Sequence, residues 1–421
     1  MNKDTLFTQF PVPTYEQWRE AAEKSLKGAA FDAKLLTKTQ EGIIRQPIYR
    51  AEDVATLPRR GGPGEAPFVR GTRSPLDQQA GRWEVCQEMA APDAKSFHEA
   101  ALTDLARGQT ALHIVFDRAV RAGLDPDEAL PEDIGKDGLS IFALEELGEA
   151  LRGLNLEELP LFVQSGALGL PVFSLLFAHM KASGHSPANL RGCIGQDPLT
   201  PLLVEGQLPH SLDTAFAAMA KMTSWASQHA PKLKTILVQG NPYCESGGHA
   251  VAELAFSLAT GVEYIQAMLD RGLTIEEVAG RMQFSFAIGS DVFMEIAKLR
   301  AVKMLWANIV DAYGGSAEAQ KIAIHARTAA WTKTVCDPYV NMLRATTEAF
   351  SAIVGGVDSL HVSAFDEAIR PANEFSRRIA RNTQIILEQE AHLAKVADPA
   401  GGSWYVEWLT DELAKKAWEL F

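Results

Sequence analysis

Side chains that could do chemistry recur at one kind of place in this sequence, directly after short apolar runs. They are Asp117, Gln196, Asp197, Tyr243, Cys244, Glu245, Ser290, Asp291, Arg327, Thr328, Asp366 and Glu367. If the runs are parallel strands, these residues meet at one edge of the sheet, where acid, base and anion-binding groups converge in barrel enzymes. Arg327 is the most informative, because an arginine ending an interior strand needs an anion or a carboxylate, which Glu205 or Glu245 could supply.

Most of these candidates also have a structural explanation. Acidic residues after strands frequently cap the following helix, which would account for Asp117, Asp291 and Asp366. His113 and His325 lie inside apolar runs, where a histidine hydrogen-bonded in the core is more common than a metal ligand. Residue type and position alone therefore do not establish a catalytic or a metal site.

The elements that must position these residues are short apolar runs alternating with amphipathic helical segments. Eight runs have the character of strands, at residues 111–116, 138–142, 161–164, 190–194, 235–239, 283–288, 323–325 and 359–362. Helical spacing is clearest at 172–181, 249–270, 292–310, 339–354 and 373–394. Eight successive βα units predict an α/β fold, a closed (β/α)8 TIM barrel. No GxGxxG follows a strand and no GxxxxGK[ST] occurs, so nucleotide-binding folds lack their usual signature.

Three segments are predicted along the chain. Residues 1–66 are expected to form an N-terminal arm, in which a helix at 15–27 carries Trp18, Ala22 and Leu26 on one face and a Gly/Pro-rich joint follows at 61–64. Residues 67–395 are the barrel, and residues 396–421 are the start of a linker helix region. The last helix, at 410–421, reaches the final residue without a stop signal, so we expect a longer natural protein.

Composition excludes several classes of protein. The 421 residues carry a formal net charge of −13, which argues against a nucleic-acid partner. No apolar stretch is long enough for a membrane span, and the first residues lack the apolar run of a signal peptide. The four cysteines form no CxxC pair, and Cys244 has no neighbouring base, which favours an idle thiol over a nucleophile. We therefore expect a cytoplasmic protein.

Longer motifs resemble the methylmalonyl-CoA mutase family. They are Gly261-Val262-Glu263-Tyr264, residues 293–301 with Leu305-Trp306, Asp337-Pro338-Tyr339-Val340-Asn341, residues 378–384, Asp398-Pro399 with Gly401-Gly402-Ser403 and Tyr405, and Trp18 with residues 22–26. They occur in the right order and extend over essentially the whole chain, which makes the resemblance specific. It implies a barrel that receives acyl-CoA, a separate flavodoxin-like domain that carries adenosylcobalamin, and a radical rearrangement between methylmalonyl-CoA and succinyl-CoA. The cobalamin loop of the family, Asp-x-His-x-x-Gly, does not occur in these residues, so that domain is expected outside this chain.

Several positions that the family uses for catalysis carry other residues here. The resemblance aligns Glu88 with a tyrosine that lies close to the migrating group in catalytic members. Gly195 and Gln196 stand within the family's Thr-Ile-Gln-Asn-Asp run, and Glu205 falls on an arginine that grips the substrate carboxylate. A glutamate at that position would repel the carboxylate instead of binding it.

The same holds after the fifth and seventh predicted strands. Pro242, followed by Tyr243, replaces a thioester-polarising histidine, and proline has no donor. Arg327 replaces a glutamine and could pair with Glu205 across the pocket that holds the acyl group in the family. We therefore expect Glu205, Tyr243 and Arg327 to block the barrel interior. Such losses are hard to reconcile with the same chemistry, and we expect no catalytic, cofactor-binding or metal-binding residue in this chain.

The resemblance is greatest to the small, non-catalytic (beta) subunit of heterodimeric members. It implies a subunit that stabilises a larger catalytic homologue, with acyl-CoA as a further candidate partner and adenosylcobalamin bound by the assembled enzyme rather than by this chain. Two alternatives stay open: an active acyl-CoA mutase with altered specificity that uses a cobalamin domain elsewhere, and an unrelated barrel enzyme that uses Tyr243, Glu245 or Arg327. An open channel along the barrel axis would favour the active mutase, and a filled interior would favour the subunit.

Overall fold

The computed structural model describes residues 13–58, 61–77 and 79–421. The chain divides into two compact units, one ending at Thr56 and one comprising Leu57–Phe421. The smaller unit contains α1 (Tyr15–Ser25), α2 (Phe31–Leu35) and the antiparallel pair β1 (Thr37–Lys38) and β2 (Ile44–Arg45). α1 begins with a capping box between Thr14 and Gln17, and Trp18 packs edge-on against the ring of Phe31. The helix expected at 15–27 is therefore present.

The larger unit is built on a parallel sheet that closes on itself. Its strands are β3 (Glu84–Val85), β4 (Glu88–Met89), β5 (Leu112–Ile114), β6 (Leu161–Gly166), β7 (Gly192–Gln196), β8 (Leu233–Gln239), β9 (Met282–Ile288), β10 (Ile324–Thr328) and β11 (Ser359–His361). The sheet order runs β3-β11-β10-β9-β8-β7-β6-β5-β4. β3 and β4 are successive pieces of one segment, and they pair with β11 and β5. The two ends of the order therefore meet, and the predicted (β/α)8 barrel is confirmed.

The set of strands differs from the predicted one at the start of the barrel. The first strand is the Glu84–Met89 segment, which lies before the first predicted run. The predicted strand at 138–142 does not join the sheet and contributes one isolated bridge, between Phe116 and Leu139. Leu139 and Ile141 are nevertheless buried, so their apolar character reflects packing rather than strand pairing.

Gln87 ties the first strand to the last. Its side chain donates to the carbonyl oxygen of Val362 and accepts from the backbone N–H of Val362 and from Gln384. Gln384 in turn accepts a hydrogen bond from the indole of Trp83. The polar groups of these buried side chains form hydrogen bonds where the first and last strands meet. Because they are paired, their burial carries no large free-energy cost.

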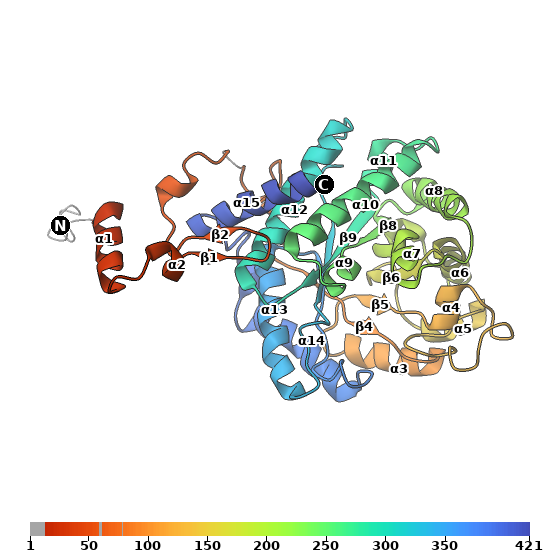
Figure 1. The fold of residues 1–421 in the computed structure, drawn as a ribbon. Helices are drawn as coiled ribbons and strands as arrows, with labels where there is room; N and C mark the ends of the chain where they lie inside the picture. Colours follow the sequence, from red (N-terminus) through yellow and green to blue (C-terminus); the bar gives the residue numbers. More distant parts are fainter. Residues whose placement is uncertain (1–12, 59–60, 78) are drawn as a thin grey trace, which may run out of the picture. The chain divides into compact units, whose positions relative to one another are not determined.

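Helices surround the strands, as Figure 1 shows for α3, α10, α13 and α14. The helices of this unit are α3 (Ala94–Leu105), α4 (Arg118–Ala122), α5 (Leu144–Ala150), α6 (Gly169–Ala182), α7 (Leu199–Glu205), α8 (Leu212–His229), α9 (Asn241–Glu245), α10 (Ala250–Leu269), α11 (Ile275–Ala279), α12 (Val292–Ala312), α13 (Asn341–Gly355), α14 (Glu374–Gln389) and α15 (Trp404–Leu420). Every helical segment that the periodicity predicted between the strands is found.

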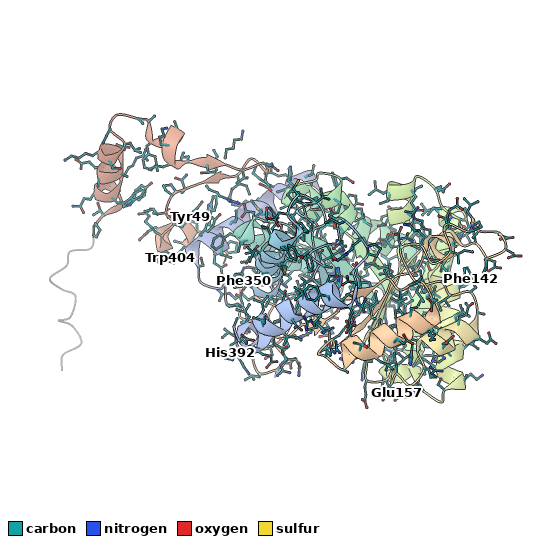
Figure 2. The ribbon with its side chains drawn as sticks, turned by 90° about the horizontal axis from the view of Figure 1, so that it is seen from below. Tyr49, Phe142, Glu157, Phe350, His392 and Trp404 are labelled. Carbon is teal, nitrogen blue, oxygen red and sulfur yellow. The ribbon has the colours of Figure 1, made fainter. Side chains whose placement is uncertain are left out.

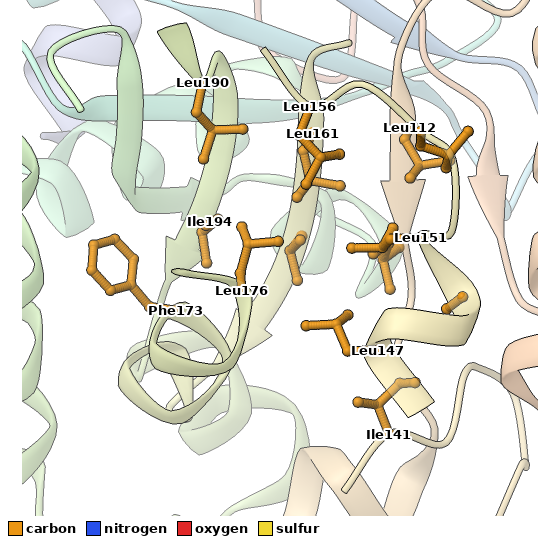
Figure 3. Close-up of a cluster of buried hydrophobic side chains, with 14 of the residues drawn as sticks. Leu112, Ile141, Leu147, Leu151, Leu156, Leu161, Phe173, Leu176, Leu190 and Ile194 are labelled. Carbon is orange, nitrogen blue, oxygen red and sulfur yellow. The ribbon is translucent and has the colours of Figure 1, made fainter. Parts of the chain in front are cut away.

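A hydrophobic core lies between the strands and the helices. Figure 3 shows one part of it, where strand residues face α5 and α6: Leu112, Leu161, Leu190, Ile194, Leu147, Leu151, Phe173 and Leu176. Full burial of each such side chain contributes about 1.5–3 kcal/mol. Some large apolar side chains lie outside this core, such as the exposed Phe350 on α13 and Trp404 at the start of α15, which Figure 2 labels.

The last helix packs against α12 as part of the barrel unit. Val406, Leu409 and Leu413 of α15 are buried. Arg300 of α12 is almost fully buried and pairs with Asp398 and with Glu407. In the described part of the chain, no helix combines the length and the apolar character that crossing a bilayer requires.

Candidate functional site: the inside and mouth of the barrel

Apolar side chains fill the inside of the barrel toward the strands' amino ends. They form one buried cluster, Cys86, Ala111, Phe162, Cys193 and Leu237. Gly195 of β7 belongs to this wall, because a Cβ at this residue would lie 2.4 Å from the Cβ of Leu237. Only glycine fits there, so the sequence-predicted position Gly195 has a packing role.

A small cavity remains beside this cluster. Its empty volume is ≈ 240 Å³, and its lining includes His113, Phe162, Gln164, Gln283, Ser285 and His325. The buried cluster beside it leaves little free space in this part of the interior.

The two histidines of this cavity are uncharged core residues. Nδ1 of His325 lies 2.8 Å from the hydroxyl of Ser359, whereas the ring nitrogens of His113 have no partner among the described residues. Burial lowers the pKa of His113 to about 4 and lowers the pKa of His325 further below its usual range. Both rings are therefore neutral near pH 7. No group of three or more His, Cys, Asp or Glu side chains in the described ranges could hold a metal ion.

Charged residues close the barrel above the cavity. Arg327 Nε donates to Glu88 Oε1 at 3.1 Å, and the same guanidinium pairs with Glu367. His361 Nε2 lies 3.5 Å from Glu88 Oε2. We call Glu88, Arg327, His361 and Glu367 the Arg327 network. It joins the first strand to β10, β11 and the loop after β11.

The pKa values in this network follow its pairing. Burial opposes the charge on Glu88, but Arg327 outweighs it and lowers the pKa of this carboxyl. Burial likewise opposes the charge on Arg327, whose pKa Glu88 and Glu367 raise. The backbone N–H of Glu88 donates to Nδ1 of His361, so the neutral ring keeps its proton on Nε2, facing Glu88. Burial lowers the pKa of His361, so near neutral pH the network is an ion-paired cluster around a neutral histidine.

The expected bridge between Arg327 and Glu205 does not form. Glu205 is the last residue of α7, a helix in which no residue is buried, and its side chain is exposed. Glu245, the other expected partner, accepts hydrogen bonds from the backbone N–H groups of Ala330 and Trp331. Glu88, aligned with a family tyrosine, is the carboxylate that pairs with Arg327.

The positions after β8 also lie outside the interior. Pro242 occupies the first turn of α9, where a missing N–H costs nothing. The hydroxyl of Tyr243 lies 2.8 Å from that of Thr260, and its ring packs on Phe256. Tyr243 therefore does not block the barrel, contrary to expectation. Burial raises the pKa of Cys244 to about 12, which fits an idle thiol.

A second network lies at the ends of β7 and β8. Buried Asp197 accepts hydrogen bonds from the hydroxyl of Tyr264, from Thr200 and, at 3.0 Å, from Gln239 Nε2. Burial raises the pKa of Asp197, and these neutral donors oppose the shift only in part. We call these four residues the Asp197 network. Gln196 faces away from it and donates to the carbonyl oxygen of Ala215 in α8, so this predicted site residue anchors a helix.

Two of the three expected helix caps are present. Asp117 caps α4 through the N–H of Val120, and Asp291 caps α12 through the N–H of Met294. Asp366 instead pairs with Arg370.

One buried charge cluster escaped the sequence reasoning. Lys298 of α12 donates to Glu253 Oε2 at 2.6 Å and lies 2.5 Å from Glu295 Oε2. Burial opposes its charge, but the two glutamates raise its pKa. The sequence signal is a Glu295–Lys298 pair at i,i+3 spacing within a largely apolar helix.

Comparison with known proteins assigns the family. Residues 38–421 match the family model described as Methylmalonyl-CoA mutase. Methylmalonyl-CoA mutase small subunits from Streptomyces virginiae and Porphyromonas gingivalis are 39% and 36% identical to the chain, over 99% and 100% of its length and 64% of theirs. The mutase of Escherichia coli is 35% identical over 96% of the chain and 57% of its own length. The chain thus spans between half and two thirds of these relatives.

The motifs identified in the sequence and the closed barrel agree with this match. The chain therefore belongs to the methylmalonyl-CoA mutase family.

Proposed function

We propose that this chain is a non-catalytic barrel subunit of a methylmalonyl-CoA mutase and that it stabilises a larger catalytic homologue in a heterodimer. The observation that carries the proposal is the Arg327 network above an interior with a cavity of only ≈ 240 Å³. A barrel that holds an acyl-CoA chain along its axis needs a continuous channel, and here ion pairs and apolar side chains occupy that space.

The side chains at the family's catalytic positions support this proposal. Glu88 is held by Arg327, Pro242 has no N–H to offer a thioester oxygen, and Tyr243 is bonded to Thr260. Each missing transition-state donor costs about 2.7–4 kcal/mol. We propose that Glu88, Gly195, Gln196, Glu205, Pro242, Tyr243 and Arg327 are degenerate positions of the ancestral pocket rather than a working site.

The residues of this chain do not fit a cobalamin site. The family's cobalamin loop, Asp-x-His-x-x-Gly, would supply a histidine to that group, and no such string occurs in the sequence. His113, His325 and His361 are buried inside the barrel. We propose that adenosylcobalamin, which supplies the radical chemistry of the assembled enzyme, is held by groups outside these residues.

The names of relatives suggest the kind of partner. Streptomyces virginiae has a methylmalonyl-CoA mutase large subunit that is 34% identical over 97% of this chain, beside its small subunit. By analogy, we propose a larger homologous subunit as partner and assign its contact to the arm, residues 1–66. The free thiols Cys86, Cys193, Cys244 and Cys336 suit a reducing compartment such as the cytoplasm.

Co-expression with the larger homologue from the same source tests the proposal. We expect a stoichiometric complex whose turnover changes less than twofold when Tyr243→Phe and Pro242→Ala are introduced together into this chain. A tenfold loss of turnover by an intact complex would show that this barrel takes part in catalysis, and failure to form any complex would contradict the subunit role.

A further inference from the structure

Two buried lysines of α12, five residues apart, have opposite surroundings. Lys298 is enclosed with Glu253 and Glu295. Lys303 is 3% exposed, and in the described part of the chain no carboxylate lies within 4.0 Å of its nitrogen. A buried ammonium without a carboxylate is costly, so the surroundings of Lys303 favour the uncharged amine.

The hydrogen bonds of Lys303 match an uncharged amine. Its Nζ donates to the carbonyl oxygen of Gly355 at 2.6 Å and to that of Leu299 at 3.2 Å. These two acceptors use the two N–H bonds of a neutral amine and leave its lone pair without a partner. Gly356, with φ +79°, leaves room beside the amine, since a Cβ there would lie 3.3 Å from Nζ.

The amine borders a partly open cavity. The cavity has an empty volume of ≈ 610 Å³, and its lining includes Lys303, Arg70, Arg73, Arg82, Asp358 and Asp398. These arginines already lie close to carboxylates: Arg73 pairs with Asp358, Arg70 lies near Asp398 and Glu407, and Arg82 lies 4.0 Å from Glu388. A guanidinium has five N–H donors, so a paired arginine can still donate to a further anion.

The charged groups that act on Lys303 are Arg300, Asp358 and Asp398. Burial is the largest influence and lowers the pKa of Lys303 to about 8, Arg300 acts in the same direction, and Asp358 and Asp398 oppose it. Lys298 shows the reverse, because its two glutamates raise its pKa despite burial. Near pH 8 a substantial fraction of Lys303 is therefore a free nucleophile.

We propose that Lys303 is a modification site whose uncharged amine takes up carbon dioxide as a carbamate. The nitrogen lone pair forms a bond to the carbon, one C–O π pair moves onto oxygen, and a proton leaves the nitrogen for water. Carbon dioxide is small, linear and uncharged, which suits an enclosed amine. The carbamate product is an anion, and Arg70, Arg73 and Arg82 line the cavity that would receive it.

Carbon-13 NMR of the full chain equilibrated with labelled bicarbonate at pH 8 tests this site. We expect one protein carbamate resonance, which is lost in Lys303→Met and retained in the control Lys181→Met, at an exposed lysine. A cooperative thermal transition shows that each variant is folded. The absence of a carbamate resonance, or its persistence in Lys303→Met, would overturn the proposal.

Cyanate provides a second test that needs no variant. Its protonated form, isocyanic acid, resembles carbon dioxide in shape and labels amines irreversibly, so peptide mass spectrometry gives a rate for each lysine. Lys303 should react about tenfold faster than Lys181 at pH 8. At a fixed cyanate concentration the reactive isocyanic acid becomes scarcer as the pH rises, so the Lys303 rate should stay steady up to about pH 8 and fall above it, whereas the rate of an ordinary lysine should stay steady up to about pH 10.4. Lys298 should remain unlabelled. A Lys303 rate no greater than that of Lys298, or one that does not fall between pH 8 and pH 10, would refute the proposal.

Discussion

The Arg327 network and the Asp197 network each hold a carboxylate at the barrel mouth, and they shift its pKa in opposite directions. Glu88 faces a guanidinium, and its pKa is lowered. Asp197 is fully buried among neutral donors such as Tyr264 and Gln239, and its pKa is raised. The charge of the neighbours, rather than burial alone, decides the direction of the shift.

The two networks also differ in the kind of interaction that holds them together. The Arg327 network depends on opposite charges that must all be present, because removal of one leaves the others uncompensated. The Asp197 network depends on several hydrogen bonds, and loss of one leaves the rest in place. The two networks should therefore respond unequally to substitution and to pH.

The largest effect is expected for Arg327→Met. This change leaves Glu88 and Glu367 facing one another without a cation, and it should lower the free energy of unfolding by about 3–5 kcal/mol. Urea denaturation monitored by circular dichroism measures it. Adding Glu88→Gln to the variant should restore part of the loss, because one uncompensated charge is then removed. A loss below about 1 kcal/mol in the single variant would contradict an ion-paired closure.

Acid should weaken the side of the barrel that holds His113. Its pKa is about 4 in the folded chain, against about 6.5 in an unfolded one. The unfolded chain therefore takes up the proton first, and the free energy of unfolding should fall as pH is lowered from about 6.5 to 4, by on the order of 3 kcal/mol. The lowered pKa of Glu88 also stabilises the folded chain. That contribution is lost only as the pH falls below 4.5, the usual pKa of this carboxyl.

A matched pair of variants isolates the histidine. His113→Phe should reduce the pH dependence of the free energy of unfolding above pH 4.5, with the remainder carried by His325, whose pKa burial also lowers. His229→Asn, at an exposed histidine, should leave the dependence unchanged. An unaltered slope in His113→Phe would show that another group carries the acid sensitivity.

A smaller effect is expected for Tyr264→Phe. It removes one of the donors to buried Asp197 and should cost about 1–3 kcal/mol in unfolding free energy. Tyr243→Phe serves as the control, because its hydroxyl bonds to Thr260 in a half-buried place, and it should cost about 0.5–1.5 kcal/mol. Equal losses would show that Asp197 does not depend on the tyrosine.

The smallest effect is expected for Glu205→Ala. Exposed substitutions away from special features usually change stability by less than about 0.5 kcal/mol. Thermal or urea denaturation measures the change. A fall of more than about 2 kcal/mol in the free energy of unfolding would show that Glu205 forms an internal ion pair and does not lie at the surface.

Much of the fold was predictable because periodicity is a local property. The long helices α10 and α12 carry apolar residues at helical spacing, and strands such as β9 are short, fully buried runs rich in phenylalanine, methionine and isoleucine. The first strand was missed because Glu84 and Glu88 interrupt its apolar character. The 138–142 run was mistaken for a strand because burial under a loop produces the same pattern as burial in a sheet.

The sequence predicts that Arg327 needs an anionic partner, but it does not predict which carboxylates supply it. An arginine ending an interior strand requires a carboxylate, and Arg327 has two. Its partner Glu88 lies 239 positions away in the sequence, and only closure of the barrel brings the two together. Glu205 was a plausible partner by position after a strand, but the course of α7 places it on the surface.

The most direct test of the central claim is turnover by the purified chain alone. The chain would be supplied with methylmalonyl-CoA, adenosylcobalamin and a separately expressed cobalamin domain, and succinyl-CoA formation would be followed by chromatography. A closed barrel without a thioester donor predicts no succinyl-CoA above the background without protein, while the larger homologue assayed in parallel turns over. Succinyl-CoA formation by this chain, with no larger homologue present, would contradict the account.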